Sequence, residues 1–242
     1  MSAMNNHDRN TPGGFLIIDK PLEMSSARAV AIVKRKSGGM KTGHAGTLDP
    51  LATGVLVLGL GAATKSISLV MGSTKRYTTT IDLTAFTTTD DAEGERTEVH
   101  LEHPPTHEDL VQSLASFNGV TMQRPPNYSA VKVGGRRAYK LARGGATPQV
   151  KPREVIAHEI TLLEYAWPTV RLQMLVGKGF YVRSLARDLG IQLGTGGHCI
   201  AIRRTAVGPF TLENAHDPDA LLDPLDLGLL IDVERAISLL GV

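Results

Sequence analysis

The amino-acid sequence predicts an α+β domain with one substantial core. The chain has 242 residues, of which 42% are hydrophobic, so it can bury one core, or a core with a small appendage. Strand-like and helix-like segments follow one another irregularly, whereas a doubly wound fold alternates them strictly. The longest apolar runs, such as Gly54–Leu60 and Leu172–Val176, are much shorter than the roughly 20 residues of a membrane-spanning helix. Composition therefore argues against disordered, fibrous and membrane-spanning classes.

The N-terminal elements can be placed between residues 15 and 36. Phe15–Asp19 predicts a short buried strand, which ends at Lys20-Pro21. Ser25 or Ser26 can then cap the start of a helix that runs to about Lys36. The expected apolar face of this helix comprises Ala27, Val30 and Val33.

A loop, two strands and a helix are expected next. Gly38–Thr53 shows neither period and is rich in Gly, Thr, Asp and Pro, which predicts an exposed loop. Val55–Leu58 predicts a buried strand, and the β-branched residues within Arg76–Leu83 predict another. Thr106 with Asp109 has the pattern that opens a helix. The side chains that this helix is expected to bury are Leu110, Val111, Leu114 and Phe117.

The second half of the chain begins with a basic insertion at about residues 122–153, where Pro and Gly accumulate among lysines and arginines. Val155–Leu163 and Val170–Val176 then resume strand patterns, the second with alternating apolar residues. A helix is predicted from about Val182 to Leu193, followed by a strand through Ile200 and Ile202. The inward face of that helix would consist of Val182, Leu185, Ala186, Leu189 and Leu193.

Charge is distributed unevenly, although the net formal charge is only +2. The segment from Glu213 to Val242 carries seven acidic residues against Arg235 alone, so the rest of the chain is basic. Clustered cations suit a polyanionic partner, although a single cluster is commonly a solvated face. The clusters are Lys34-Arg35-Lys36, Arg136-Arg137-Lys140-Arg143, Lys151-Arg153 and Arg203-Arg204.

The N-terminus and the single cysteine bear on cellular location. Met1–Gly13 is polar, lacks the apolar centre of a signal peptide, and is expected to be a disordered leader. Cys199 is the only cysteine, which excludes an internal disulfide and a cysteine-based zinc site, and we expect it to be a small buried residue. These features predict a cytoplasmic protein.

Gly43–Gly54 is the most informative segment. Its glycines let the backbone approach a ligand, and Asp49 precedes the rigid Pro50. An isolated Asp-Pro pair usually forms a turn. This segment is longer than such a turn, and its sequence, GHAGTLDPLATG, resembles almost residue for residue the catalytic loop of the TruB family of tRNA pseudouridine-55 synthases.

Further family motifs occur in the expected order, so the resemblance extends from Gly14 to about Gly208. They include an opening strand, two site motifs, an acidic turn and the start of an RNA-gripping insertion. In chain order the segments that resemble them are Gly14–Pro21, Lys75-Arg76-Tyr77, Thr89–Gly94, Arg124–Lys132 and Lys178–Arg183.

The resemblance implies a pseudouridine-synthase-like fold, with a mixed, mainly antiparallel sheet flanked by helices and loops, in a catalytic domain at residues 14–212. It also implies isomerisation of the uridine at position 55 in the T-loop of tRNA, whose T-arm would be the partner. This reaction labilises the glycosidic bond, holds the uracil, and reattaches it through carbon. Nothing is oxidised, so no cofactor or metal is expected, which agrees with the scattered positions of the histidines.

The resemblance assigns catalytic roles to three residues. Asp49 matches the essential aspartate, which can act as a nucleophile on the ribose or the base, or begin by removing a ribose proton; the sequence leaves these paths open. Arg183 matches the arginine that keeps the carboxylate charged. Tyr77 matches the tyrosine expected to stack on the target uracil.

Other residues are matched to substrate binding. A base in a folded loop must be extruded, at a cost of roughly a few kcal/mol, and His44 matches a histidine that stacks in the vacated space. Asp91 matches a contact to the extruded or neighbouring nucleotides, with a simple turn-forming role as the alternative. Tyr181 and Ile202 match the lining of the uridine pocket, and Lys20 is expected to support the site. The insertion residues expected to bind RNA are Lys132, Arg136, Arg137, Lys140 and Arg143.

Two features depart from the family pattern. Glu23 stands where the family usually has glycine, so the local turn or its RNA contact is expected to differ. Bacterial members commonly carry a C-terminal PUA-type RNA-binding domain, and the residues after Gly208 are too few to make one. The acidic tail at residues 213–242 is instead expected to be helical and to pack on the catalytic domain.

Three alternative functions can be compared with this one. The same chemistry could act on another RNA, in the catalytic subunit of a guide-dependent complex. A noncatalytic tRNA-binding or tRNA-folding protein would not need Asp49. A phosphate loop at Gly59–Lys65 is disfavoured because the full G-x-x-x-x-G-K-[ST] spacing is missing. We expect a monomer with no obligatory protein partner and no membrane association.

Overall fold

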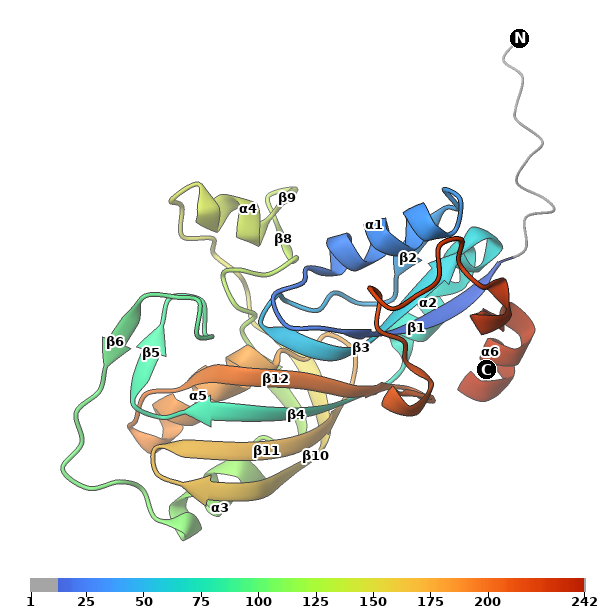
Figure 1. Ribbon diagram of the computed structural model, residues 1–242. Helices are drawn as coiled ribbons and strands as arrows, with labels where there is room; N and C mark the ends of the chain where they lie inside the picture. Colours follow the sequence, from blue (N-terminus) through green and yellow to red (C-terminus); the bar gives the residue numbers. More distant parts are fainter. Residues whose placement is uncertain (1–12, 242) are drawn as a thin grey trace. The chain divides into compact units, whose positions relative to one another are not determined.

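The computed structural model describes residues 13–241, so the predicted leader at Met1–Gly13 lies almost entirely outside the described residues. The chain divides into two compact units (Figure 1). The first contains the residues up to Arg76 and from Arg203 onward, and the second contains Tyr77–Ile202. The boundaries fall inside two strands, β4 (Lys75–Asp82) and β12 (His198–Val207), so each unit contains one end of both strands.

The first unit is built on a sheet with strand order β14-β1-β3-β12, in which β1 pairs antiparallel with both β14 and β3. Its core forms between β1, β3 and the C-terminal segment, and includes Phe15, Val57 and Phe210. The bounds of its other elements are β1 Gly14–Lys20, α1 Ser26–Lys36, β2 Thr42–His44, β3 Ala52–Leu60, α2 Ile67–Gly72, β13 Phe210–Thr211, β14 Ile231–Asp232 and α6 Val233–Leu240, with short 3-10 turns at Gly61–Ser66, Leu212–Asn214 and Leu227–Leu229.

Helix α1 begins where the sequence predicts, with Ser25 as the N-cap, because the side chain of Ser25 accepts a hydrogen bond from the amide of Arg28. The buried face of the helix contains Ala29 and Val33. The predicted apolar face was partly wrong, since Ala27 is exposed. Val33 is buried as expected, while Ser26 and Ala29, one position before Ala27 and Val30, occupy the rest of the inward stripe.

The C-terminal segment packs on the last turn of α1. The Nζ of Lys36 is buried and donates hydrogen bonds to the carbonyls of Asp219 and Leu221, and Arg35 lies 3.9 Å from Asp223. Two cations of the basic cluster at residues 34–36 are therefore bound to the C-terminal segment of the same chain. Within residues 213–241, regular α-helix is confined to α6.

The second unit contains an antiparallel sheet with strand order β12-β4-β11-β10-β7. On β11 alternate residues from Val170 to Val176 are buried, while Arg171 between them is exposed, which is the pattern of a sheet with one covered face. The remaining elements are β5 Ala85–Thr87, β6 Arg96–Glu98, α3 His107–Ala115, β7 Gly119–Gln123, β8 Lys132–Val133, β9 Arg136–Arg137, α4 Ala138–Arg143, β10 Arg153–Ala166, β11 Thr169–Val176 and α5 Val182–Leu193.

Helix α3 opens with the capping box that the sequence predicts. The side chains of Thr106 and Asp109 each bond the backbone of the other residue. Leu110 and Leu114 are buried as expected, but Val111 is 46% exposed, so its predicted burial was wrong. Helix α3 packs on α5 and β10, and only the stripe that faces them is covered.

The predicted α+β class with a mainly antiparallel sheet is confirmed. The prediction for one segment was wrong, because Gly38–Thr53 is not simply an exposed loop. It contains β2, which pairs with β3, and it buries the side chains of Ala45 and Leu48. Short apolar residues flanked by glycine carry too weak a periodic signal to reveal such burial.

The turn between β1 and α1 is unusual at Glu23, which has a φ of +64°. This is the left-handed region that residues with a Cβ rarely adopt, and glycine enters it without steric cost. The glycine that the resemblance leads one to expect here would adopt this turn without steric cost. The backbone turn is kept despite the glutamate side chain, which is exposed.

We expect Glu23→Gly to increase the free energy of unfolding by about 1 kcal/mol, because relief of the left-handed strain outweighs the added freedom of the unfolded chain. Urea unfolding would measure the change. The control is Glu95→Gly, an exposed glutamate without a positive φ, which should lower stability. Destabilisation by Glu23→Gly would show that the turn is not strained.

Candidate active site

The loop that carries Asp49 is closed by backbone hydrogen bonds within the first unit. It enters from β2, where the amide of Ala45 donates to the carbonyl of Val57 at 2.8 Å. After Asp49 the chain turns, and the amide of Ala52 donates to the Asp49 carbonyl at 3.1 Å. Asp49 itself is half-buried. A carboxylate at this position can meet a ligand while its backbone is fixed on both sides.

The residue before Asp49 is held by Ser26. The hydroxyl of Ser26 accepts a hydrogen bond from the Leu48 amide and donates one to the Leu48 carbonyl, both at 2.8 Å. Ser26 is 3% exposed and the Leu48 side chain is buried beneath the loop. One hydroxyl therefore satisfies both backbone groups of Leu48.

The residue after Asp49 is held by the turn that follows β1. The amide of Glu23 donates to the Pro50 carbonyl at 2.9 Å. The Nζ of Lys20 lies 3.5 Å from the same carbonyl and donates to those of Pro21 and Met24 at 2.8 and 2.6 Å. The left-handed backbone of Glu23 thus directs its amide at the loop that carries Asp49.

Arg204 holds the two ends of the loop from β12. Its Nε donates to the Val55 carbonyl at 2.6 Å and its Nη2 to the Gly46 carbonyl at 3.1 Å. The side chain is only 2% exposed. The strand passes so close to Gly54 that a Cβ there would lie 2.2 Å from the Arg204 carbonyl oxygen, which explains the glycine.

Lys20, the last residue of β1, is a fully buried cation beside this loop. Burial lowers the pKa of Lys20 to about 8, while the negative charge of Asp49 opposes that shift and the positive charge of Arg204 adds to it. Lys20 and Asp49 are thus electrostatic neighbours. The predicted supporting role of Lys20 corresponds in the structure to bonds with backbone carbonyls.

In the second unit, Arg183 is fixed in the first turn of α5. Its Nη1 lies 3.0 Å from the carboxylate of Asp91 and also donates to the Thr89 carbonyl at 2.8 Å. Its Nη2 donates to the Tyr128 carbonyl at 3.0 Å. Asp91 is only 3% exposed and accepts bonds within its own turn, so the structure gives it a turn-forming role and an ion pair with Arg183.

A second ion pair lies one helical turn further along α5. Arg187 bonds Asp90 at 2.8 Å and Asp188 at 2.9 Å, and its Nη2 donates to the Arg124 carbonyl. Asp90 has a φ of +61°. Burial raises the pKa of Asp90 and Arg187 opposes that rise, so the pair anchors the acidic turn to the helix.

Tyr181 is held by both ends of the basic insertion. The side-chain amide of Gln123 bonds the Tyr181 backbone in two directions, at 2.8 and 3.0 Å. The Arg153 guanidinium lies 5.1 Å from the centre of the Tyr181 ring, a cation–π distance. Gln123 and Arg153 are themselves paired on β7 and β10, so the base of the insertion is tied to this residue.

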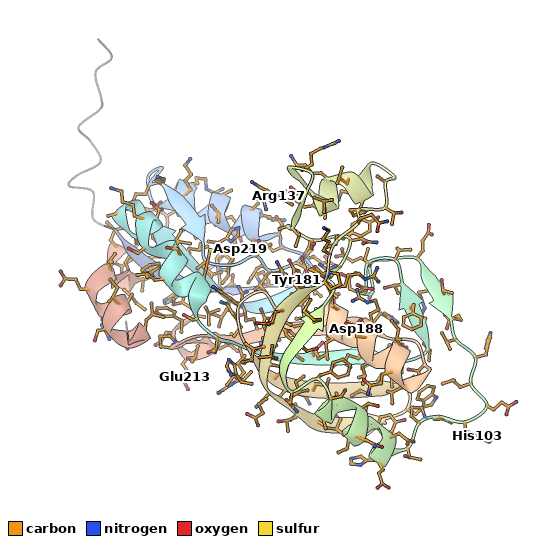
Figure 2. The ribbon with its side chains drawn as sticks, turned by 180° about the vertical axis from the view of Figure 1, so that it is seen from behind. His103, Arg137, Tyr181, Asp188, Glu213 and Asp219 are labelled. Atoms are coloured by element: carbon orange, nitrogen blue, oxygen red, sulfur yellow. The ribbon has the colours of Figure 1, made fainter. Side chains whose placement is uncertain are left out.

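The insertion carries the basic residues predicted to bind RNA. It forms the β8-β9 hairpin and α4 between β7 and β10, and Figure 2 shows Arg137 on it and Tyr181 near its base. All five side chains are exposed: Lys132, Arg136, Arg137, Lys140 and Arg143. Their positive charge is available to a polyanion.

Within residues 13–241, no group of three or more His, Cys, Asp or Glu side chains could hold a metal ion. No helix in this range is long and apolar enough to cross a bilayer. A surface pocket of about 620 Å³ lies at the start of α3, lined in part by Pro105 and Gln192, and includes none of the predicted site residues.

Comparison with known proteins identifies the family. A model described as the N-terminal domain of TruB family pseudouridylate synthases matches residues 34–182, and one described as the tRNA pseudouridylate synthase B C-terminal domain matches residues 183–228. The chain belongs to the TruB family. The resemblance drawn from its motifs is confirmed.

Relatives named tRNA pseudouridine synthase B support this TruB assignment. One from Thermobifida fusca is 47% identical over 220 residues, covering 86% of this chain and 74% of the relative. One from Agrobacterium fabrum is 43% identical over 240 residues, which cover 93% of this chain and 75% of the relative. A chain of a crystallised Cbf5-Nop10-Gar1 complex aligns with a TM-score of 0.72 at 26% identity, over 93% of this chain and 62% of that one.

The structure places the predicted TruB site residues in two groups. Lys20, His44 and Asp49 belong to the first unit, where His44 is the last residue of β2 and is half-buried. In the second unit the half-buried Tyr77 lies on β4 and the buried Ile202 on β12. Arg183 and Asp91, both in the second unit, are in direct contact.

Four residues that position the site through hydrogen bonds were not predicted from the sequence to do so. They are Ser26, Gln123, Arg187 and Arg204. Arg204 had been grouped with Arg203 as a basic surface cluster, which was wrong. Successive residues of a strand point to opposite faces, so Arg204 is buried while Arg203 is partly exposed and paired with Asp19. A polar residue at an inward position of a predicted strand, such as Arg204 on β12, was the signal that could have revealed this role.

The lowered pKa of Lys20 predicts that stability rises with pH. Between pH 8 and 10.5 the unfolded chain holds a proton on this lysine that the folded chain has released, so the free energy of unfolding increases. Below pH 8 the cost of burying the charge is fully present. Urea unfolding across this window should show the wild type gaining stability relative to Lys20→Met.

The reference for this measurement is Lys34→Met, which removes an exposed lysine from α1. A difference between wild type and Lys20→Met that stays constant across the window would contradict the assignment of the pKa shift to burial.

Proposed function

We propose that this chain converts uridine 55 in the T-loop of tRNA to pseudouridine, with Asp49 as the essential carboxylate. The observation that carries the proposal is the catalytic loop. It matches the TruB pattern, and the residues on both sides of Asp49 are fixed by buried groups. A turn-forming aspartate would need no such support.

The reaction breaks the bond between the ribose C1′ and N1 of uracil and forms one between C1′ and C5. The proton on C5 is lost and N1 gains one, so no atom or electron leaves in the net reaction. Asp49 initiates this exchange while the base is held in the pocket. Preorganisation matters because a misplacement of about 1 Å can cost roughly 100-fold in rate.

The remaining roles rest on the family resemblance. Tyr77 stacks on the uracil, and Tyr181 and Ile202 line its pocket. Arg183 provides the cation that an ionised Asp49 needs. Its ion pair with Asp91 and its two bonds to carbonyls keep the guanidinium in one orientation. Asp91 then acts through Arg183, in addition to any contact with neighbouring nucleotides.

Recognition of tRNA is assigned to the insertion and to His44. The exposed cations of β9 and α4 contact the phosphates of the T-arm, which position the RNA without reading its sequence. His44 stacks in the space that the extruded base leaves, and so offsets the lost stacking. We expect the enzyme to act as a cytoplasmic monomer.

A second candidate keeps the chemistry but changes the RNA. The likeness to a chain of the Cbf5-Nop10-Gar1 complex, at a TM-score of 0.72, favours considering it. Relatives at 43–47% identity that are named tRNA pseudouridine synthase B favour tRNA. The site of modification in a mixed RNA pool separates the two.

We expect the wild-type protein alone to form pseudouridine at position 55 of an unmodified tRNA transcript, and Asp49→Asn to form none while still binding the tRNA. Chemical mapping of pseudouridine at single-nucleotide resolution measures the product, and filter binding measures affinity. The control is Asp217→Asn, an exposed carboxylate in the same unit, which should keep full activity.

Binding of tRNA by the wild type without any pseudouridine would favour the noncatalytic reading. Modification of other RNAs but not of tRNA would favour the second candidate. Full activity of Asp49→Asn would remove Asp49 from the mechanism.

A further inference from the structure

The segment between β1 and α1 holds the catalytic loop at two points that enclose a single residue. Ser26 binds the amide and carbonyl of Leu48, and the amide of Glu23 binds the carbonyl of Pro50. The residue between the two anchored neighbours is Asp49. Its backbone torsions are therefore bounded from both sides.

Pro50 restricts Asp49 further. A residue before proline is kept out of the α region by contact with the proline ring, so its ψ stays extended. With Leu48 anchored at both its amide and its carbonyl, the peptide plane that leads into Asp49 cannot rotate without breaking a buried hydrogen bond. These constraints fix the backbone from which the Asp49 side chain projects.

Two adjacent serines at the start of α1 make different hydrogen bonds. The Ser25 side chain is exposed and caps the helix by accepting from the Arg28 amide. Ser26 is buried and directs its hydroxyl away from its own helix to Leu48, 22 residues later. A helix cap explains Ser25, whereas nothing in the helix needs the Ser26 hydroxyl.

Helix α1 supplies a rigid base for this contact. Ser26 is its first residue, and Lys36 at its other end is bonded to the carbonyls of Asp219 and Leu221. The helix is thus fixed at both ends within the first unit. A contact from such a helix positions a loop more reproducibly than a contact from another loop.

We propose that Ser26 is a positioning residue for the reaction, which acts through Leu48 to set the direction of the Asp49 carboxylate. This inference rests on the proposed function, because it matters only if Asp49 reacts with the RNA. Ser26 is 3% exposed, so its side chain is closed off from a bound RNA. Its loss should therefore lower turnover without weakening the binding of tRNA.

The test compares Ser26→Ala with Ser25→Ala in steady-state and single-turnover assays on a tRNA transcript. We expect Ser26→Ala to reduce kcat by roughly 10- to 100-fold with an unchanged KM. Ser25→Ala should lower the melting temperature through loss of the cap but leave kcat unchanged. Ser26→Thr, which restores a hydroxyl, should recover most of the lost turnover.

Ser26→Cys covers the case in which Ser26→Ala does not fold, because a thiol preserves the approximate volume but bonds weakly. It should show the same loss of kcat. Equal kcat values for the wild type and a folded Ser26 variant would overturn the proposal, as would a change confined to KM. Inactivity of the wild type itself would instead refute the proposed function.

Discussion

Asp49 owes its position to hydrogen bonds made by its neighbours. Leu48 is held by a buried hydroxyl from α1, and Pro50 by an amide and a lysine from the turn after β1. Other elements of the first unit hold these hydrogen-bonding groups in place. The sheet pairing of β1 with β3 brings the turn to the loop, and the C-terminal segment fixes the far end of α1. The half-buried carboxylate of Asp49 is thus carried on a backbone that is fixed on both sides.

Buried cations are used in the two units for different purposes. Lys20 and Arg204 bind mainly backbone carbonyls, so their charges are satisfied by dipoles while they pin the loop around Asp49. Arg183 and Arg187 instead pair with Asp91 and Asp90, which joins α5 to the acidic turn. Removing one partner of such a buried pair leaves an uncompensated charge, so the arrangement tolerates little change.

Much of the fold follows from local patterns in the sequence. The bounds of α5 match those expected, because an apolar stripe of period 3.6 runs its whole length, and the capping box fixed the start of α3. The residues of the candidate site were harder to predict from the sequence. The family motifs led to Asp49 and Arg183, but Ser26 and Arg204 act across 22 and about 150 residues, and no local pattern encodes such contacts. Glu23 differs in its side chain from the expected glycine, but its backbone adopts the left-handed conformation that glycine favours.

The central claim is that the loop is held at Leu48, and amide hydrogen exchange at that residue tests it most directly. In an irregular segment an amide without a partner exchanges quickly, whereas one bonded to a buried hydroxyl is protected. The account predicts slow exchange of the Leu48 amide in the wild type and in Ser25→Ala, and fast exchange in Ser26→Ala. Exchange at the rate of an open loop in the wild type, or protection that survives the loss of the Ser26 hydroxyl, would contradict it.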